Sequence, residues 1–386
     1  MRILIAPDKF KGSLGAHEVG AALAAGVREA LPAAEVEICP LADGGEGTAE
    51  VIRLALGGER ISCPVHDARG RPVEAGYGWV PASRRAVMEM SAAAGLFRLQ
   101  PNERDPLTAS TFGVGEMLRC AAARGAEEIT LGLGGSATND GGFGLARALG
   151  FQFFTAAGRE LSGAVPDLLD LARIAVPNEP SLPRVVAACD VRNPLLGPTG
   201  ATRTFGAQKG ATPKQTEILE RALRRLADVA AETFGSDHRA TAGAGAAGGL
   251  GFGLLTFCGA TVRSGFEVVA ELIGLREKIT RADVVITGEG KLDRQTLSGK
   301  APAGVARLAR AAGKRVFAIV GQAEGKEPGE LFDAVIALND TSPSYRDTEK
   351  LLRERARELA LQLSDRQSSD PKEGADPGVS RTSVDQ

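Results

Sequence analysis

The sequence of 386 residues predicts an α/β protein: a doubly wound, mostly parallel sheet into which a second α/β domain is inserted. Strand-like apolar runs alternate with helical patterns near both ends of the chain. From about residue 61 this alternation gives way to short apolar runs separated by Gly and Pro turns, and it returns near residue 282. We therefore predict one domain from residues 1–60 and 283–363, a second from residues 61–282, and a disordered polar tail over residues 364–386.

The first domain is predicted from strands and helices that follow one another in turn. The N-terminal part begins with a strand over residues 2–6 and a helix over 16–31, whose apolar residues recur at helical spacing. A strand over 36–40 and a helix over 47–56 follow. After the insertion, the expected elements are strands over 283–287, 315–320 and 333–338 and helices over 303–312 and 349–363. This alternation is typical of a parallel sheet covered by helices.

The inserted domain has a different pattern. Short strands over residues 61–65, 73–80 and 86–90 are joined by Gly and Pro turns, which is typical of antiparallel pairing. Further on we expect helices over 111–124, 142–149 and 213–234 and strands over 128–132 and 185–188. The glycine-rich stretch 243–253 is expected to form a flexible loop that moves when the domains close on a substrate.

Composition excludes several classes of protein. Lys and Arg number 46 against 48 Asp and Glu, so the net charge of -2 offers no basic surface for a nucleic acid or an anionic membrane. The N-terminus lacks the apolar segment of a signal peptide, and no stretch reaches the roughly 18 apolar residues that span a bilayer. Five widely spaced cysteines without a C-x-x-C pair are typical of a reducing compartment. We expect a cytoplasmic protein, and both a monomer and a homodimer remain open.

Glycines and charged residues follow five of the predicted strands. Ligands of open α/β sheets bind at the carboxyl ends of the strands, near helix N-termini. Each segment alone can be an ordinary turn or helix cap, but their repetition favours one binding site. The segments are DKFKGS (8–13), LADGGEGT (41–48), GLGGSATNDGG (132–142), CDVRNPL (189–195) and GEGKLD (288–293), the last followed by SGK (298–300).

Common catalytic and nucleotide-binding motifs do not account for these segments. Residues 132–142 fit the dinucleotide-binding pattern only loosely, and neither glycine stretch with a lysine near the C-terminus has Walker A spacing. The three histidines lack the spacing of metal ligands, and no G-x-S-x-G nucleophile elbow is present. The strand ends themselves therefore carry the functional prediction.

Seven motifs, in order along residues 1 to about 363, resemble those of the class I glycerate kinase family. They are APDKFKGSL, PLADGGEGT, GLGGSATNDGG, CDVRNPLLGPTGA, QKGA, GAGAAGGLGFG and DVVITGEGKLDRQTLSGKAP. The resemblance implies a flavodoxin-like domain, an inserted domain similar to a restriction-enzyme core, and transfer of the γ-phosphoryl group of ATP to D-glycerate, giving 2-phosphoglycerate. Two residues depart from the family pattern: Ala207 replaces an expected Pro, and Ala303 replaces a larger apolar residue. Neither departure removes a functional group.

Residue roles follow from position, because phosphoryl transfer depends mostly on positioning and charge neutralisation. Asp190, at the end of a buried strand, is the expected general base. The expected catalytic residues are Asp190, Lys11 and Asp43, and the substrate-binding residues are Lys9, Ser13 and Lys209. The expected nucleotide-binding residues are Gly134, Gly135, Ser136, Asn139 and Lys291, and the expected Mg²⁺ ligands are Asp43, Asp190 and Glu289.

Two alternatives stay open on the sequence. A kinase of the same fold could act on another small hydroxy acid or polyol, because the motifs predict anion recognition and not the number of carbons. A nucleotide- or metabolite-binding regulatory protein without turnover is a second alternative, although carboxylates at several strand ends argue against it. The sequence also leaves 2- versus 3-phosphorylation undecided.

Overall fold

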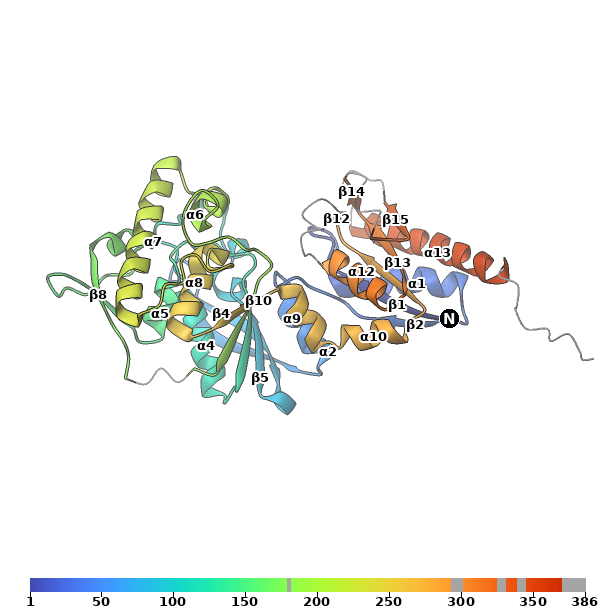
Figure 1. The fold of residues 1–386 in the computed structure, drawn as a ribbon, viewed down its shortest axis with the longest axis horizontal. Helices are drawn as coiled ribbons and strands as arrows, with labels where there is room; N and C mark the ends of the chain where they lie inside the picture. Colours follow the sequence, from blue (N-terminus) through green and yellow to red (C-terminus); the bar gives the residue numbers. More distant parts are fainter. Residues whose placement is uncertain (179–181, 293–300, 325–330, 339–344, 370–386) are drawn as a thin grey trace, which may run out of the picture.

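Two sheets lie side by side along the molecule, with helices α2 (Thr48–Ala55) and α9 (Gly265–Leu272) between them (Figure 1). The computed structural model describes residues 1–178, 182–292, 301–324, 331–338 and 345–369. The protein is thus a mixed α/β protein with parallel sheets, as predicted.

The first sheet is five-stranded and parallel throughout, in the order β15-β13-β11-β1-β2. Numbered along the chain within this sheet, the spatial order is 2-1-3-4-5, so the chain builds outward from β1 in two directions. The carboxyl ends of β1 and β11 therefore form a topological switch point, where open α/β sheets bind ligands. The strands are β1 (Arg2–Pro7), β2 (Glu35–Ile38), β11 (Val284–Gly288), β13 (Arg315–Val320) and β15 (Ala334–Ala337).

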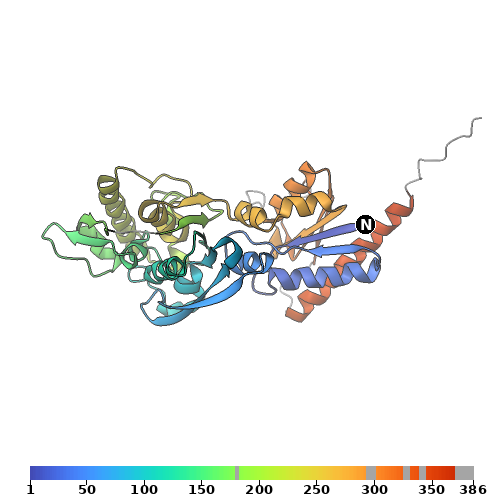
Figure 2. The same ribbon diagram turned by 90° about the horizontal axis from the view of Figure 1, so that it is seen from below.

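Helices cover both faces of the first sheet, because successive residues of a strand point to opposite faces. Ile3 and Ile5 pack against α1 (Ala16–Ala30) and α13 (Tyr345–Ser369), which lie side by side (Figure 2). Leu4 and Ala6 belong to the core on the other face, with α2, α9, α10 (Leu275–Arg281) and α12 (Ala301–Ala311).

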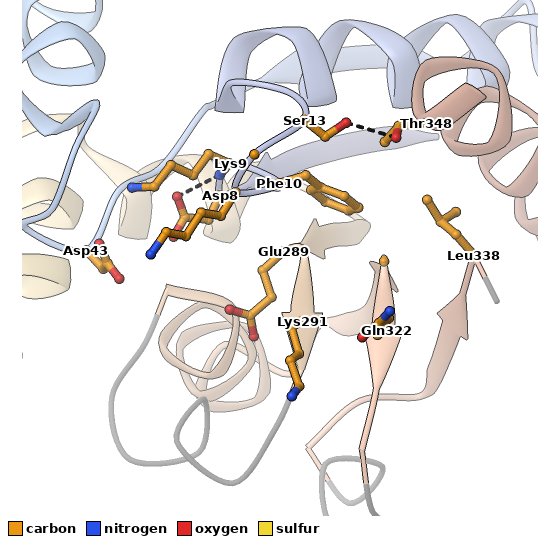
Figure 3. Close-up of a pocket in the computed structure, with 14 residues that line it drawn as sticks. Asp8, Lys9, Phe10, Ser13, Asp43, Glu289, Lys291, Gln322, Leu338 and Thr348 are labelled. Carbon is orange, nitrogen blue, oxygen red and sulfur yellow. Dashed lines mark hydrogen bonds between the residues drawn. The ribbon is translucent and has the colours of Figure 1, made fainter. Parts of the chain in front are cut away.

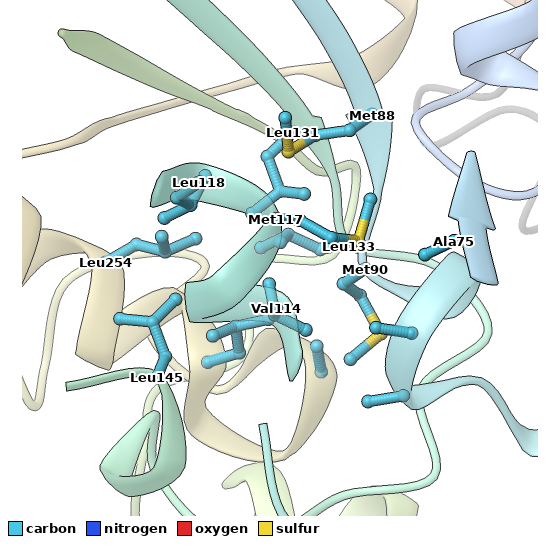
Figure 4. Close-up of a cluster of buried hydrophobic side chains, with 14 of the residues drawn as sticks. Ala75, Met88, Met90, Val114, Met117, Leu118, Leu131, Leu133, Leu145 and Leu254 are labelled. Carbon is cyan, nitrogen blue, oxygen red and sulfur yellow. The ribbon is translucent and has the colours of Figure 1, made fainter. Parts of the chain in front are cut away.

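The second sheet is six-stranded and mixed, in the order β10-β9-β6-β5-β4-β3. Strands β3, β4 and β5 pair antiparallel, whereas β5, β6, β9 and β10 pair parallel. Many buried residues of this sheet and of helix α4 form one apolar core, which includes Met88, Met117 and Leu131 (Figure 4). Its elements are β3 (Glu59–His66), β4 (Pro72–Val80), β5 (Arg85–Glu89), β6 (Glu128–Gly132), β9 (Arg184–Ala188), β10 (Thr261–Arg263), α3 (Ser91–Ala94), α4 (Phe112–Ala123), α5 (Phe143–Ala148) and α8 (Ala246–Cys258).

A third apolar core lies at the end of the molecule farthest from the first sheet (Figure 1). Here α7 (Pro213–Phe234) packs against the hairpin of β7 (Gln152–Thr155) and β8 (Leu171–Ala175), and Phe153 contacts Phe143 edge to face. The remaining short elements are α6 (Ala201–Phe205), β12 (Lys291–Leu292), β14 (Gln322–Ala323) and the 3₁₀ helices η1 (Pro81–Ser83), η2 (Leu96–Arg98), η3 (Pro101–Glu103), η4 (Val165–Asp170) and η5 (Ala207–Lys209). None of the described helices is long and apolar enough to cross a membrane.

The structure corrects the prediction for residues 243–253. Residues 246–253 belong to the buried helix α8, and Ala247, Gly248 and Gly249 within it have left-handed backbone angles. A Cβ at Gly248 would lie 2.0 Å from the carbonyl oxygen of Thr138, so glycine is required there for close packing. The glycines of this stretch therefore allow close packing against neighbouring backbone and do not form the predicted flexible loop.

Two boundaries also differ from the prediction. Helix α13 continues to Ser369, so residues 364–369 are helical and not part of a disordered tail; extending an existing helix costs little. The remaining tail, 370–386, lies outside the described residues. Helices α9 and α10 pack into the core of the first sheet, so the chain returns to that sheet near residue 265, ahead of the predicted residue 283.

Candidate active site

A cavity of about 410 Å³ lies at the switch point, over the carboxyl ends of β1, β11 and β13 (Figure 3). Its walls come from the loop after β1, from the segment after β11 and from the first turn of α13. The lining residues are Asp8, Lys9, Phe10, Lys11, Gly12, Ser13, Asp43, Glu289, Gly290, Lys291, Gly321, Gln322, Leu338 and Thr348. Six of the predicted site residues are thus brought together: Lys9, Lys11, Ser13, Asp43, Glu289 and Lys291.

The loop after β1 presents two ammonium groups to this cavity. The ring of Phe10 is buried, as expected for a side chain that turns inward between Lys9 and Lys11. Lys9 Nζ donates a hydrogen bond to the carbonyl oxygen of Glu46 over 2.5 Å, whereas Lys11 is exposed. Ser13 Oγ donates to Thr348 Oγ1 over 2.9 Å, so the last helix of the chain orients this hydroxyl group.

Carboxylates face the same cavity as the lysines. Asp8 and Glu289 are buried, and Asp43 is partly buried. Lys291 lies at the exposed edge, where it forms an ion pair with Glu324 at 2.8 Å. Ammonium groups can neutralise the charge of a phosphoryl group or a carboxylate, and carboxylates can hold Mg²⁺ or orient a hydroxyl group.

The loop that carries Asp43 lies between the two sheets and packs closely against the second. The amide of Gly134, after β6, donates to the carbonyl oxygen of Gly44 over 3.3 Å. A Cβ at Gly44, whose φ is +85°, would lie 2.8 Å from the carbonyl oxygen of Ala188, at the end of β9. Only glycine fits this approach, which brings Asp43 into the electrostatic neighbourhood of Asp190.

Asp190 stands just beyond the end of β9, at the start of α9. Its Oδ1 accepts hydrogen bonds from Ser264 Oγ at 2.7 Å and from the Gly265 amide at 2.9 Å. Its Oδ2 is buried and has no hydrogen-bond partner among the residues that the structure describes. Burial, reinforced by the negative charge of Asp43 and opposed by the Ser264 hydrogen bond, raises the pKa of Asp190 to about 6. An unpaired carboxylate oxygen with a pKa near neutrality suits a general base.

Asp190 does not line the cavity in Figure 3, and the glycine segment 134–139 does not line it either. Gly134 and Gly135 are accessible, but Ser136 and Asn139 are buried within the second sheet's core. The Ala137 amide donates to Ala94, and Asn139 Nδ2 donates to Thr202 Oγ1 over 2.9 Å. Several polar groups expected to bind phosphate are therefore already paired within the protein.

Lys209 is buried beneath the same glycine segment. Its Nζ donates to the carbonyl oxygen of Thr138 over 2.7 Å, and only 1% of the residue is exposed. Burial lowers the pKa of Lys209 to about 7, an effect that the charge of Asp140 partly opposes. Lys209 thus stabilises the glycine segment through its hydrogen bond to Thr138, and it does not line the cavity of Figure 3.

Sequence reasoning missed four residues of this region. Asp8 and Gln322 line the cavity, Thr348 binds Ser13, and Glu89 lies partly buried at the end of β5. Asp8 is a carboxylate directly after a predicted strand, as Asp43 is, so the same pattern could have predicted it. Glu89 lies inside the predicted strand 86–90 and Thr348 just before the predicted helix 349–363, with no glycine next to either. Only the packing brings them to the site.

The arrangement fits Mg²⁺ held by few protein ligands. No group of three His, Cys, Asp or Glu residues within the described part of the chain is placed to hold a metal ion. Mg²⁺ commonly binds through one or two carboxylates and completes its shell with waters and substrate phosphates. Asp43 and Glu289, the two expected metal ligands that line the cavity, meet that requirement. Asp293, Ser298 and Lys300 of the C-terminal motif lie outside the described residues.

Comparison with known proteins places the chain in a family. A model of the glycerate kinase family matches residues 3–365. A glycerate kinase of Bacillus subtilis is 44% identical over 324 residues, 83% of this chain and 85% of that protein. A glycerate 2-kinase of Escherichia coli is 42% identical over 324 residues, 83% of this chain and 85% of that protein.

A solved structure agrees with these sequence matches. The crystal structure of a protein assigned as glycerate kinase 2 in Salmonella typhimurium LT2 superimposes with a TM-score of 0.84 at 40% identity, covering 96% of this chain and 100% of that one. The chain belongs to the glycerate kinase family.

Proposed function

We propose that this protein is an ATP-dependent glycerate kinase that phosphorylates D-glycerate to 2-phosphoglycerate. The observation that carries the proposal is the cavity at the β1–β11 switch point, where Lys9, Lys11 and Lys291 face Asp43 and Glu289. A simple phosphate-binding site favours cations, whereas phosphoryl transfer also needs carboxylates for a metal ion and for the attacking hydroxyl group. The names of the relatives from Bacillus subtilis and Escherichia coli support the same substrate.

In the proposed reaction the 2-hydroxyl oxygen of glycerate bonds to the γ-phosphorus as the bond to the β-phosphate oxygen breaks. Lys9 and Ser13 bind the glycerate carboxylate, and Lys11 neutralises charge on the transferred group. The unpaired Oδ2 of Asp190 takes the hydroxyl proton, and its raised pKa suits that role near neutral pH. Because Asp190 lies outside the cavity of Figure 3, we propose that the two sheets approach each other on substrate binding.

The nucleotide phosphates are proposed to bind between Lys291 and the accessible glycines 134 and 135. Ser136, Asn139 and Lys209 then contribute from within the protein, because their burial lets them fix the shape of the glycine segment. Mg²⁺ would be held by Asp43 and Glu289, which line the cavity, and it would neutralise the charge of the nucleotide phosphates. The third expected ligand, Asp190, has one unpaired oxygen, and that oxygen is the proposed base.

We also propose the finer architecture that the sequence predicted. The strand order 2-1-3-4-5 supports a flavodoxin-like first domain, which is made from both chain ends. An inserted domain similar to a restriction-enzyme core, a cytoplasmic location and a monomeric or homodimeric state remain predictions.

A coupled assay of ADP release with Mg-ATP and D-glycerate tests the proposed function, and phosphorus NMR reads the position of the new phosphate. Turnover that yields 2-phosphoglycerate is the expected result. Turnover only with another hydroxy acid would keep the kinase and change the substrate. ATP binding without turnover on any acceptor would refute the proposal and favour a regulatory binding protein.

A further inference from the structure

Glu89 connects the two sheets through a pair of hydrogen bonds. It is the last residue of β5 in the second sheet. Its Oε1 accepts hydrogen bonds from the amide of Gly47 at 3.0 Å and from the amide of Ala49 at 2.9 Å. Both amides belong to the start of α2, which follows a strand of the first sheet. The carboxylate of the second sheet thus binds the start of a helix that lies between the two sheets, where Val51 and Ile52 pack against both Val87 of β5 and residues of the first sheet.

These bonds supply a helix cap that the local sequence lacks. The N-cap residue of α2 is Gly47, which has no side chain that could accept from the first amides of the helix. The Thr48 amide donates to the nearby Gly45 carbonyl oxygen, and the Gly47 and Ala49 amides are left for Glu89. A carboxylate at a helix N-terminus satisfies those amides and interacts favourably with the helix dipole. Burial raises the pKa of Glu89, while the two amides and the nearby Lys9 favour its ionised form.

The capped helix holds the loop that presents Asp43. Besides Glu89 at its end, this loop is held by Lys9, which binds the Glu46 carbonyl, and by the Gly134 amide, which binds the Gly44 carbonyl. The amide of Gly45 then donates to Asp43 Oδ1 over 3.2 Å. A shift at the Glu89 anchor would therefore be transmitted along only a few residues to the Asp43 carboxylate.

We propose that Glu89 is a positioning residue for phosphoryl transfer: it fixes the loop of residues 43–47 between the two sheets and so sets the position of Asp43. The inference rests on the proposed kinase function. Glu89 does not contact the reacting groups itself; it affects the reaction only by holding the loop that places Asp43. A misplacement of about 1 Å at a reacting centre typically costs about 10²-fold in rate.

The test compares Glu89→Ala, which removes the cap, with Glu89→Gln, which keeps an oxygen acceptor of the same shape. We expect kcat to fall roughly 10²-fold in Glu89→Ala and about tenfold or less in Glu89→Gln, with KM for both substrates within about threefold. In the background of Asp43→Asn, Glu89→Ala should lower kcat by no more than about threefold, because both changes disturb the same group.

A matched control is Glu220→Gln in α7, at the end of the molecule away from the cavity (Figure 1). Glu220 is a buried carboxylate and, like the partly buried Glu89, it accepts a backbone hydrogen bond, here from the Gly197 amide at 2.6 Å. This variant should change thermal stability as much as Glu89→Gln and leave kcat unchanged. A loss of kcat in Glu220→Gln as large as the loss in Glu89→Ala would show that Glu89 is merely structural.

A second measurement separates this inference from the proposed function. Hydrogen exchange of the amides of residues 47–49 should be at least about tenfold faster in Glu89→Ala than in the wild type, whether or not the protein turns over. Unchanged hydrogen exchange of these amides in Glu89→Ala would overturn the positioning role and leave the proposed function standing. The same would follow if the fold-losses of kcat in Glu89→Ala and Asp43→Asn multiplied in the double variant. A wild-type protein that is inactive on glycerate and ATP would overturn the proposed function and, with it, the catalytic part of the inference.

Discussion

Replacing Asp190 with Asn removes a negative charge from the site while keeping the shape of the side chain. The oxygen of the new amide can still accept from Ser264 Oγ and from the Gly265 amide, the two groups that bind Asp190 Oδ1. The atom that changes is Oδ2, which is buried without a partner. A side-chain amide cannot take a proton from a substrate hydroxyl group, so we expect kcat to fall about 10²–10⁴-fold, the usual contribution of a general base.

The same substitution should make the protein more stable at pH 7. Folding raises the pKa of Asp190 from 3.8 to about 6, so the ionised carboxylate is less favourable in the folded than in the unfolded chain. Stability is therefore lost as the pH rises from about 4 to about 6, and it stays lost above that range. At 1.36 kcal/mol per pKa unit the loss is at most about 3 kcal/mol. Asp190→Asn removes this cost above pH 6 and gains nothing below pH 4.

The assay for both effects is steady-state kinetics together with thermal unfolding between pH 4 and 8. Wild-type kcat/KM should fall below pH 6. The unfolding temperature of Asp190→Asn should match that of the wild type near pH 4, exceed it increasingly between pH 4 and 6, and exceed it by a constant amount above pH 6. Asp333→Asn is the control, because Asp333 also accepts a backbone hydrogen bond, from Val316, but at the amino end of β13, away from the cavity. Near-wild-type kcat in Asp190→Asn would eliminate the base, and a lower unfolding temperature at pH 7 would refute the electrostatic argument.

Three further predictions concern the loops around the cavity. Lys9→Met should raise KM for D-glycerate about 10–100-fold and leave KM for ATP unchanged. Lys291→Met should raise KM for ATP by a similar factor and leave KM for D-glycerate unchanged. Equal effects on the KM values of both substrates would refute these assignments. Gly134→Ala should lower kcat at least about tenfold, because its Cβ would lie 2.5 Å from the backbone of the neighbouring loop, and unchanged kinetics would show that the loops separate freely. The pKa of Lys209 is lowered from 10.5 to about 7, so the free energy of unfolding of the wild type should rise between pH 7 and 10. Urea titrations of Lys209→Met should lack this rise. An equal rise in both proteins would show that another group causes it.

Local sequence signals predicted elements where those signals are strong. Helix α7 runs from Pro213 to Phe234 as expected, since Thr212 caps its first turn by accepting from the Gln215 amide and Gly235 ends it with a left-handed backbone. The apolar run of β1 likewise predicts a buried strand. The stretch 243–253 was predicted wrongly, because glycine is a poor helix former locally and its value there comes from close contact with distant backbone.

The sequence by itself determined which groups gather at the cavity of the first sheet. Lys9, Lys11 and Asp43 follow strands of one parallel sheet, and the carboxyl ends of such strands share one edge whatever the details of packing. Only the tertiary structure decided what surrounds them. The burial of Lys209 depends on how η5 packs under the glycine segment that follows β6, and the Glu89 cap depends on how the end of β5 lies against α2. No local pattern records such contacts between segments about 40 or more residues apart.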